Sequence, residues 1–263
     1  LIWTPRQSNL IGLHNGTSWV MVQPASTPLA FNNAAVLGGG TLASGFNYDV
    51  FANYVSPEEF TLEFNKWATD TTRVTAPQRF EGILVFDTTT SGIKKSYLGT
   101  VRPYYNGVDV VFVDTKEKRL LMNYYNKTKK PFGKSCPYSS NTFIASSTTG
   151  LRRWNNNADY LIEVITDGLN AFELACSLYQ ENGSYGHVCF SLDSQNSIAP
   201  ECGRPRSNMA GTRTCVWSYT ASEGYHFIYP LSITGGNNEY YYYWNDASGR
   251  DAIISQVDGW IWS

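Results

Sequence analysis

The stretch Phe172–Gln180, FELACSLYQ, is followed by Glu181-Asn182-Gly183-Ser184 and then by Tyr185–Leu192, YGHVCFSL. Two β-type runs on either side of Asn-Gly predict a β-hairpin, because a type I′ turn needs positive φ at both central residues. If Asn-Gly is the two-residue loop, Cys176 lies opposite Cys189 in a non-hydrogen-bonded pair. The Cα atoms of such a pair are about 4.5 Å apart, within disulfide reach. The sequence therefore predicts a Cys176–Cys189 disulfide, or two adjacent thiols in a reducing compartment.

Similar runs recur along the chain between clusters of Gly, Asn, Ser and Pro, whereas helical periodicity is scarce. This pattern predicts an all-β fold, an antiparallel β-sandwich of jelly-roll or galectin-like type with little helix. Val108–Asp114 and Arg119–Tyr125 are predicted as a second hairpin. Pro57–Phe60 begins either a helical turn or, as the alternative, a strand over Phe60–Trp67. The other predicted strands are Thr17–Gln23, Phe80–Asp87, Leu161–Thr166, Thr214–Tyr219, Tyr225–Ile233 and Glu239–Trp244.

The composition excludes several classes of protein. Charged residues are 16% of the 263 residues and aromatic residues 15%, which excludes intrinsic disorder and a coiled coil. A pI near 5.9 provides no global basic field, so we expect no nucleic-acid partner. No apolar run approaches the roughly 18–20 residues of a membrane span, so we expect no membrane insertion. We expect a single β-rich domain over 1–263, with a second lobe over about 151–263 as the alternative.

The remaining cysteines and the sequons favour an oxidising compartment. Cys202 and Cys215 are a second candidate disulfide, which would close the Gly/Pro/Arg-rich loop between them and leave Cys136 as the odd thiol. No C-x-x-C pair or H-E-x-x-H motif is present, so we expect no metal and no cofactor. The N-x-S/T sequons, together with these cysteines, favour an extracellular location. The glycosylation candidates are Asn15, Asn126 and Asn182.

Basic residues gather near aromatic residues in one part of the chain, and this is the first candidate binding site. Lys or Arg together with Tyr can hold a carboxylated sugar through charge-assisted hydrogen bonds. The alternative is a solvated loop that protects a sheet edge. In the run Tyr240–Trp244, a strand would place Tyr241 and Tyr243 on one face, exposed to solvent or a partner, unless the strand is buried on both sides. The candidate ligand-binding residues are Lys129, Lys130, Lys134, Tyr138, Arg152, Arg153, Trp154, Tyr241 and Tyr243.

Two further sets of residues carry weaker expectations. Trp260 and Trp262 share one face of a strand and are predicted to pack against the body of the protein. Glu163, Glu173 and Glu239 lie in or beside β-type runs, where two of them would serve a glycoside hydrolase. Nothing in the sequence singles out a pair, so they are interpreted as outward residues on half-exposed strands.

One segment carries a family resemblance. Phe80–Gly92, FEGILVFDTTTSG, followed by Val110–Tyr125 with its Lys-Glu-Lys tip and then by Asn126-Lys127-Thr128, resembles the galectin-like rotavirus spike head. The two sugar-binding motifs of true galectins, His-x-Asn-x-Arg and Trp-x-x-Glu-x-Arg, are absent, so no binding residue is carried over. The resemblance implies a class: a viral or similar surface head that recognises host receptors or glycans.

The functional hypothesis is therefore the receptor-binding head of a viral attachment, spike or capsid protein. It would bind a host cell-surface glycan or protein receptor without catalysis, and a homo-oligomer would turn weak single contacts into avidity. One alternative is a β-sandwich enzyme acting on polysaccharide, either a glycoside hydrolase or a lyase. The other is a structural oligomerisation module.

Overall fold

The structure is a computed structural model in which contacts divide the chain into two compact units. Unit 1 comprises Leu1–Val113 and Leu120–Lys127, and unit 2 comprises Asp114–Arg119 and Thr128–Ser263. The expectation of one domain, or of a second lobe from about residue 151, stays a prediction beside this division. The residues that the structure describes are 2–3, 10–24, 29–30, 42–87, 92–135, 143–145, 150–154, 160–180, 186–203, 206–207, 211–234, 239–242 and 256–263.

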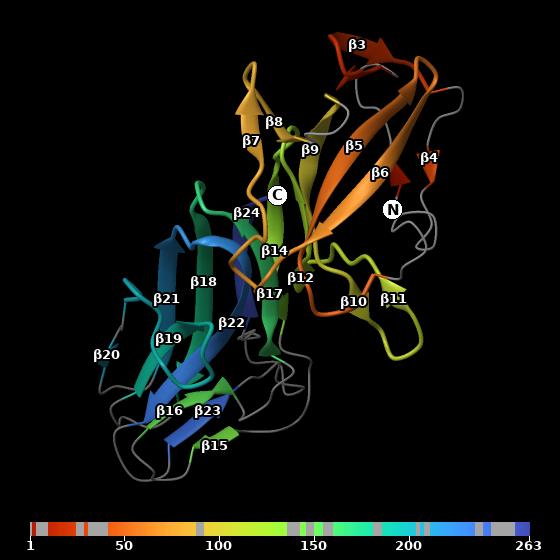
Figure 1. Cartoon of the computed structure of the whole chain (residues 1–263). Coiled ribbons are helices and arrows are strands. Elements are labelled where there is room, and N and C mark those ends of the chain that lie inside the picture. Colours follow the sequence, from red (N-terminus) through yellow and green to blue (C-terminus); the bar gives the residue numbers. More distant parts are fainter. Residues whose placement is uncertain are drawn as a thin grey trace. The chain divides into compact units, whose positions relative to one another are not determined.

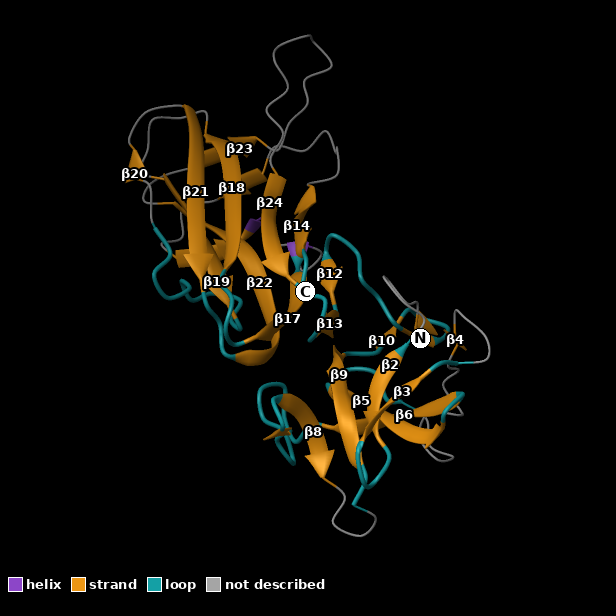
Figure 2. Cartoon of the chain, turned by 90° about the horizontal axis from the view of Figure 1, so that it is seen from above, coloured by secondary structure: helices purple, strands orange, loops and turns teal. Residues whose placement is uncertain are grey.

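Strands make up nearly all of the regular structure in these residues, and the predicted all-β, antiparallel sandwich-type fold is confirmed (Figure 2). Unit 1 holds β1 (Ile2–Trp3), β2 (Ile11–His14), β3 (Trp19–Val22), β4 (Leu29–Ala30), β5 (Tyr48–Ser56), β6 (Glu59–Lys66), β7 (Gln78–Phe80), β8 (Ile83–Asp87), β9 (Lys94–Val101), β10 (Tyr104–Tyr105), β11 (Val110–Val111) and β13 (Leu121–Asn123). Unit 2 holds β12 (Lys118–Arg119), β14 (Lys129–Ser135), β15 (Phe143–Ala145), β16 (Gly150–Arg153), β17 (Ile162–Asp167), β18 (Phe172–Gln180), β19 (Gly186–Leu192), β20 (Arg206–Ser207), β21 (Gly211–Tyr219), β22 (Glu223–Thr234), β23 (Glu239–Tyr242) and β24 (Gln256–Trp262).

Unit 1 is built on a sheet with the order β6-β5-β9-β8-β7, to which β13 adds by pairing with β9. Side chains alternate along β5, so Val50 and Ala52 join the core that the β2–β3 hairpin shares, while Asp49 points to the other face. There Arg73 donates to both Asp49 oxygens at 2.6 and 3.2 Å. Thr100 Oγ1 donates to the same carboxylate at 2.8 Å, so the buried charge is fully engaged.

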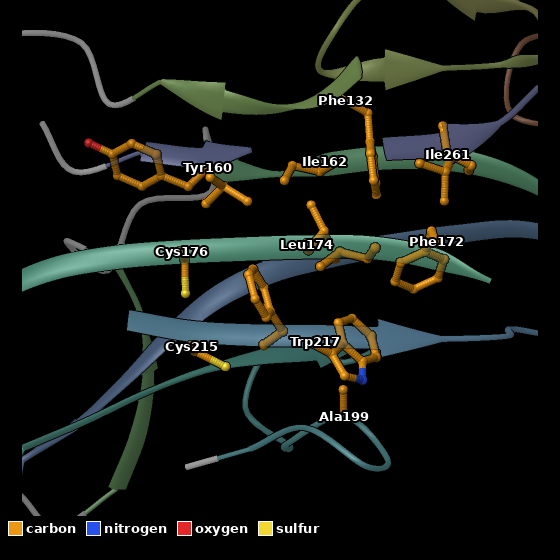
Figure 3. Close-up of a cluster of buried hydrophobic side chains, with 14 of the residues drawn as sticks. Phe132, Tyr160, Ile162, Phe172, Leu174, Cys176, Ala199, Cys215, Trp217 and Ile261 are labelled. Carbon is orange, nitrogen blue, oxygen red and sulfur yellow. The ribbon is translucent and has the colours of Figure 1, made fainter. Parts of the chain in front are cut away.

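Unit 2 contains two sheets whose side chains meet in one core. One sheet has the order β12-β17-β22-β19-β20 and the other β14-β24-β18-β23-β15, with β21 paired to β18 (Figure 1). Phe172 and Leu174 of β18 pack with Ile162 of β17 and Phe190 of β19. Trp217 of β21 lies against Phe172, with ring centroids 5.0 Å apart (Figure 3). Its ring centroid is also 5.7 Å from that of Phe190.

The hairpin predicted from Phe172–Leu192 is wrong. β18 pairs with β21, β23 and β24, whereas β19 pairs with β20 and β22, so the two runs belong to different sheets. Both runs have one apolar face, and placing them in facing sheets buries both of those faces in the same core. This burial outweighs the local preference of the Asn-Gly dipeptide for a tight hairpin.

The second predicted hairpin forms only at its tip, where Asp114 and Arg119 are antiparallel bridge partners and Thr115 N–H donates to the Lys118 carbonyl at 2.9 Å. The longer pairing predicted for its two strands is wrong. Val110–Val111 pairs with β10, while Arg119–Tyr125 is divided between β12, which pairs in parallel with β17, and β13, which pairs with β9. Near Pro57 the strand alternative is confirmed, because β6 runs antiparallel to β5 and Ser56 lies opposite Glu59. Pro57 and Glu58 form the loop.

The position of Gly259 in β24 gives a test of the sheet. A Cβ atom there would lie 1.9 Å from the Glu173 carbonyl oxygen of β18, a contact that only backbone movement relieves. We expect Gly259→Ala to lower the free energy of unfolding by about 2–3 kcal/mol, as overpacking does. Gly203→Ala is the control, since no atom lies within 4 Å of its Cβ position. Equal urea midpoints for the two variants would contradict the β18–β24 pairing.

Burial of Asp49 gives a pH-dependent prediction for unit 1. Burial raises the pKa of Asp49 above 3.8 and outweighs the opposing effect of Arg73. The folded protein therefore holds the proton more tightly than the unfolded chain, so the contribution of Asp49 to stability falls as pH rises from about 4 through the folded-state pKa. We expect the free energy of unfolding of wild type minus that of Asp49→Asn to decrease over this interval, in urea titrations at successive pH values. A difference that rises with pH would contradict this assignment.

Candidate ligand-binding face

The outer face of the β14-β24-β18-β21 sheet carries two exposed tryptophans. Trp260 and Trp262 are 46% and 40% exposed, while Val257 and Ile261, which alternate with them on β24, are buried. Same-face residues two apart on a strand are about 7 Å apart, so the two rings are neighbours. The two tryptophans share one face, as the Trp-x-Trp spacing predicts, but the prediction that they pack against the body is wrong.

Residues on the neighbouring strands surround the two indoles. Trp260 lies between Pro131 of β14 and Glu173 of β18, and Trp262 lies opposite Lys129. The Lys129 Nζ atom is 5.7 Å from the centroid of the Trp260 ring and 3.9 Å from Glu173 Oε2. We call this surface, defined by Lys129, Pro131, Glu173, Trp260 and Trp262, the tryptophan face.

The positive and negative charges on and beside the tryptophan face offset each other, and some of these groups remain accessible to a ligand. Lys129 and Glu173 have side chains 48% and 60% exposed, so their ion pair contributes little and leaves both groups open to a ligand. Asp258, also on β24, pairs with Lys116. Ser177 and Thr214 add hydroxyls 2.9 Å apart on the neighbouring strands. The face therefore combines aromatic rings with hydrogen-bonding groups and little net charge.

The predicted lysine patch does not form a single site. Lys129 lies on the tryptophan face, but Lys130 points to the opposite side of β14 and its Nζ is 2.8 Å from Asp114 Oδ2. Lys134 lies near Lys118, whose pKa is lowered by burial first and by the Lys134 charge second. Adjacent strand residues point to opposite faces, which separates lysines that are close in sequence.

The other candidate binding residues are scattered. Arg152 and Arg153 pair with Ser232 and Leu231 of β22, and the Arg153 guanidinium lies 5.4 Å from the Tyr229 ring centroid. Trp154 has no exposed surface and belongs to the core, so its assignment to ligand binding is wrong. The backbone of Tyr241 pairs with Phe143 and Gln180. Tyr138, Tyr243, Asn182 and Cys136 lie outside the described residues.

Of the three candidate glutamates for glycoside hydrolysis, Glu163 and Glu173 have described side chains, and these two do not form a catalytic pair. Glu163 is 8% exposed, receives a hydrogen bond from Tyr225 at 2.8 Å, and pairs with Lys118. Glu173 lies on the outer face of the other sheet. One carboxylate is thus engaged inside the protein, while the other belongs to the tryptophan face.

The predicted Cys176–Cys189 disulfide is wrong, because its hairpin does not form. Cys176 lies opposite Cys215, and Cys189 lies opposite Leu231 in the other sheet; no disulfide joins the four described cysteines. The second candidate pair does come together, since the Sγ atoms of Cys202 and Cys215 are 3.6 Å apart.

Two glycosylation candidates lie in turns. The Asn15 side-chain oxygen accepts hydrogen bonds from the backbone N–H groups of Thr17 and Ser18 at 3.0 and 2.9 Å. Asn126 is exposed and its backbone N–H donates to Asn123 Oδ1 at 3.0 Å. Both positions stay predictions as glycan attachment sites.

One Ser-His-Asp arrangement occurs away from the tryptophan face. His226 Nδ1 lies 2.7 Å from Asp193 Oδ2, and His226 Nε2 lies 3.4 Å from Ser222 Oγ but only 2.7 Å from the Ser222 carbonyl oxygen. A carbonyl oxygen can only accept, so Nε2 carries a proton and cannot remove one from the Ser222 hydroxyl. The arrangement joins two loops rather than activating a nucleophile.

Within the described ranges, the chain has neither a cluster of metal-ligating residues nor a membrane-spanning helix. No group of three or more His, Cys, Asp or Glu residues there has the geometry to hold a metal ion. None of the described elements is an apolar helix long enough to cross a membrane.

Comparison with known proteins identifies no family. No protein-family model and no curated protein matches the chain. Among solved structures, the chain is similar to an insecticidal delta-endotoxin of Bacillus thuringiensis, with 11% identity over 100% of this chain and 52% of that chain and a TM-score of 0.29. It is also similar to an exo-β-1,3-galactanase of Phanerochaete chrysosporium, with 10% identity over 92% and 68% of the two chains and a TM-score of 0.20. The chain thus spans about half the length of the toxin, and similarities this low carry no argument.

The His226 arrangement predicts opposite outcomes for two neighbouring variants. His226→Ala removes a buried ring that satisfies Asp193 and the Ser222 carbonyl, so we expect a loss of about 2–3 kcal/mol in the free energy of unfolding. Ser222→Ala should stay within about 0.5 kcal/mol, because this side chain is exposed. Urea denaturation measures both. Labelling of Ser222 by a fluorophosphonate probe, which reacts with activated serines, would contradict the structural role.

Proposed function

We propose that this protein is a non-catalytic glycan-binding module that takes a neutral oligosaccharide on the tryptophan face. The supporting observation is the exposure of Trp260 and Trp262 side by side on a sheet whose other face is core. Indole rings stack on the apolar faces of sugars, and contiguous exposed apolar surface rimmed by polar residues marks interaction sites. Since the rings are about 7 Å apart, a ligand that covers both extends over at least two sugar rings.

The polar groups favour an uncharged ligand. The Lys129 ammonium can donate to sugar hydroxyls and the Glu173 carboxylate can accept from them, and their charges offset each other. The predicted lysine patch would have favoured a carboxylated sugar. On the tryptophan face, the carboxylate of such a sugar would lie close to the Glu173 carboxylate. Repulsion between the two carboxylates makes an acidic glycan the poorer ligand.

Within this proposal, the wider role is attachment to a host cell. The resemblance of Phe80–Gly92 and Val110–Thr128 to a viral spike head supports a receptor-binding head on the extracellular or virion surface. A protein receptor, or a second copy of the chain, is the other kind of partner that an exposed tryptophan pair fits. Glycan-array binding and the solution mass of the tryptophan variants distinguish a glycan from these other partners.

Removal of either indole tests the proposal. On a glycan array holding matched neutral and sialylated glycans, wild type should bind neutral glycans of two or more rings. Trp260→Ala and Trp262→Ala should each weaken binding to the best array glycan about tenfold, measured by calorimetric titration. Tyr105→Ala is the matched control, because Tyr105 is 53% exposed but lies in unit 1, and it should bind as wild type does.

Three results would contradict the proposal. The first is unchanged glycan binding in both tryptophan variants. The second is release of new reducing ends during incubation with the bound glycan, which would favour the polysaccharide-active enzyme. The third is an empty array combined with a solution mass that falls from oligomer to monomer in the tryptophan variants, which would favour an oligomerisation module.

A further inference from the structure

Three cysteines meet at one point in the core of unit 2. Cys176 of β18 and Cys215 of β21 are register partners, and each is 1% exposed (Figure 3). Cys202 follows a turn closed by a hydrogen bond from its own N–H to the Ala199 carbonyl at 3.3 Å. Its Sγ lies 3.6 Å from Cys215 Sγ, and it is only partly buried. Cys215 is therefore between one buried thiol and one that solvent can reach.

The turn that carries Cys202 is fixed on both sides. Trp217 Nε1 donates to the Pro200 carbonyl at 2.9 Å, which ties the turn to β21 two residues from Cys215. Phe190 N–H lies 3.2 Å from Cys202 Sγ, and its carbonyl accepts from Ala199 N–H at 2.8 Å. A disulfide bond is about 2.05 Å long, so the two sulfurs need to approach by about 1.5 Å. Rotation about the Cα–Cβ bonds supplies a movement of this size.

Cys176 competes for the same sulfur. Its hydrogen bond with Cys215 is the largest cause of the rise in the pKa of the Cys215 thiol to about 12; burial contributes to this rise, and the hydrogen bond with Cys202 opposes it. Cys189 belongs to a second cluster, with Tyr229 and Leu231, and Cys202 packs against this cluster as well as against the core that holds Cys176 and Cys215. The contact that singles out Cys215 as the partner of Cys202 is the distance of 3.6 Å between their Sγ atoms.

We propose that Cys215 is the shared partner of two mutually exclusive disulfides: a small disulfide oxidant of the glutathione type joins it to Cys202, and Cys176 takes the place of Cys202 only when Cys202 is removed. This inference is independent of glycan binding. It goes beyond the Cys202–Cys215 pair that the sequence predicts, because it adds Cys176 as the replacement partner of Cys215.

The chemistry is two thiol–disulfide exchanges. The Cys202 thiolate, which solvent can reach, attacks one sulfur of the oxidant; the oxidant's S–S bond breaks and one glutathione thiolate leaves with the Cys202 proton. The Cys215 sulfur then attacks Cys202 Sγ in the mixed disulfide, and the second glutathione leaves with the Cys215 proton. Two protein thiols are oxidised and one glutathione disulfide is reduced to two thiols. The raised pKa of Cys215 makes the second step the slower one, so it accelerates as pH rises.

Disulfide mapping of the whole chain tests the proposal. Reduced protein is freed of reductant, incubated with oxidised glutathione, alkylated, and digested for mass spectrometry without reduction. After alkylation in urea, wild type should give the Cys202–Cys215 peptide and alkylated Cys176. Cys202→Ser is refolded from urea with oxidised glutathione, because Cys176 and Cys215 are both buried in the folded chain, and it should give Cys176–Cys215. Cys215→Ser should give neither link and should retain glutathione on Cys202. Oxidation should raise the Tm of wild type by roughly 5–10 °C, because the bond closes a loop of 12 intervening residues, Gly203–Thr214.

Matched variants keep the result interpretable. Cys189→Ser should reproduce the wild-type map, and Cys176→Ser should retain Cys202–Cys215 at the wild-type yield. Circular dichroism of each reduced variant establishes that it is folded before oxidation. The proposal is overturned if Cys202 and Cys215 stay alkylatable after oxidation, if wild type contains Cys176–Cys189 or a link to Cys136, or if Cys215→Ser yields Cys176–Cys202.

Discussion

The position of the C-terminal strand β24 between β14 and β18 is the constraint on which unit 2 depends. It places Trp262 opposite Lys129 and Trp260 opposite Glu173. In both pairs the two residues are separated in sequence by more than half the length of the unit. Gly259 permits this placement, because any Cβ there would collide with the backbone of β18. Once β24 is in place, alternation fixes the rest: Val257 and Ile261 complete the core, and Trp260 and Trp262 face outward.

Local patterns predicted the strands better than their partners. The runs Phe172–Gln180, Phe60–Trp67 and Tyr225–Ile233 are strands, because alternating apolar residues suit a half-buried sheet. Which strands pair with each other depends on the apolar surface that is buried across the whole unit. A short turn sequence such as Asn-Gly or Lys-Glu-Lys does not determine this. The Cys176–Cys189 disulfide prediction is wrong for the same reason, because it required β18 and β19 to be the paired strands of one hairpin. The pair Cys202 and Cys215 needed no register, and it is the pair that the fold brings together.

The sequence predicted part of the candidate site. The pattern Trp-x-Trp placed both indoles on one face, but a single strand does not show which of its faces meets the core. Lys129 was singled out for the wrong reason, as one of a lysine cluster that alternation then separated. Glu173 was considered as a catalytic residue, yet its register partner is Trp260. In each case the strand lying next to the residue determined its surroundings, and a local sequence pattern does not specify a neighbour that is far away in the chain.

The charged groups inside the protein and those on the tryptophan face differ in what they can still bind. Asp49 and Glu163 are buried and paired with Arg73 and Lys118, so their charges are neutralised within the fold. Lys129 and Glu173 are both largely exposed and only loosely paired.

A ligand on the tryptophan face would gain stacking on two rings and a few water-exposed hydrogen bonds. A flat face leaves the other side of the sugar in solvent, so each site alone is weak. Strong attachment by such a site therefore requires several copies acting together, and this links the proposed binding mode to the oligomer that the sequence analysis expects.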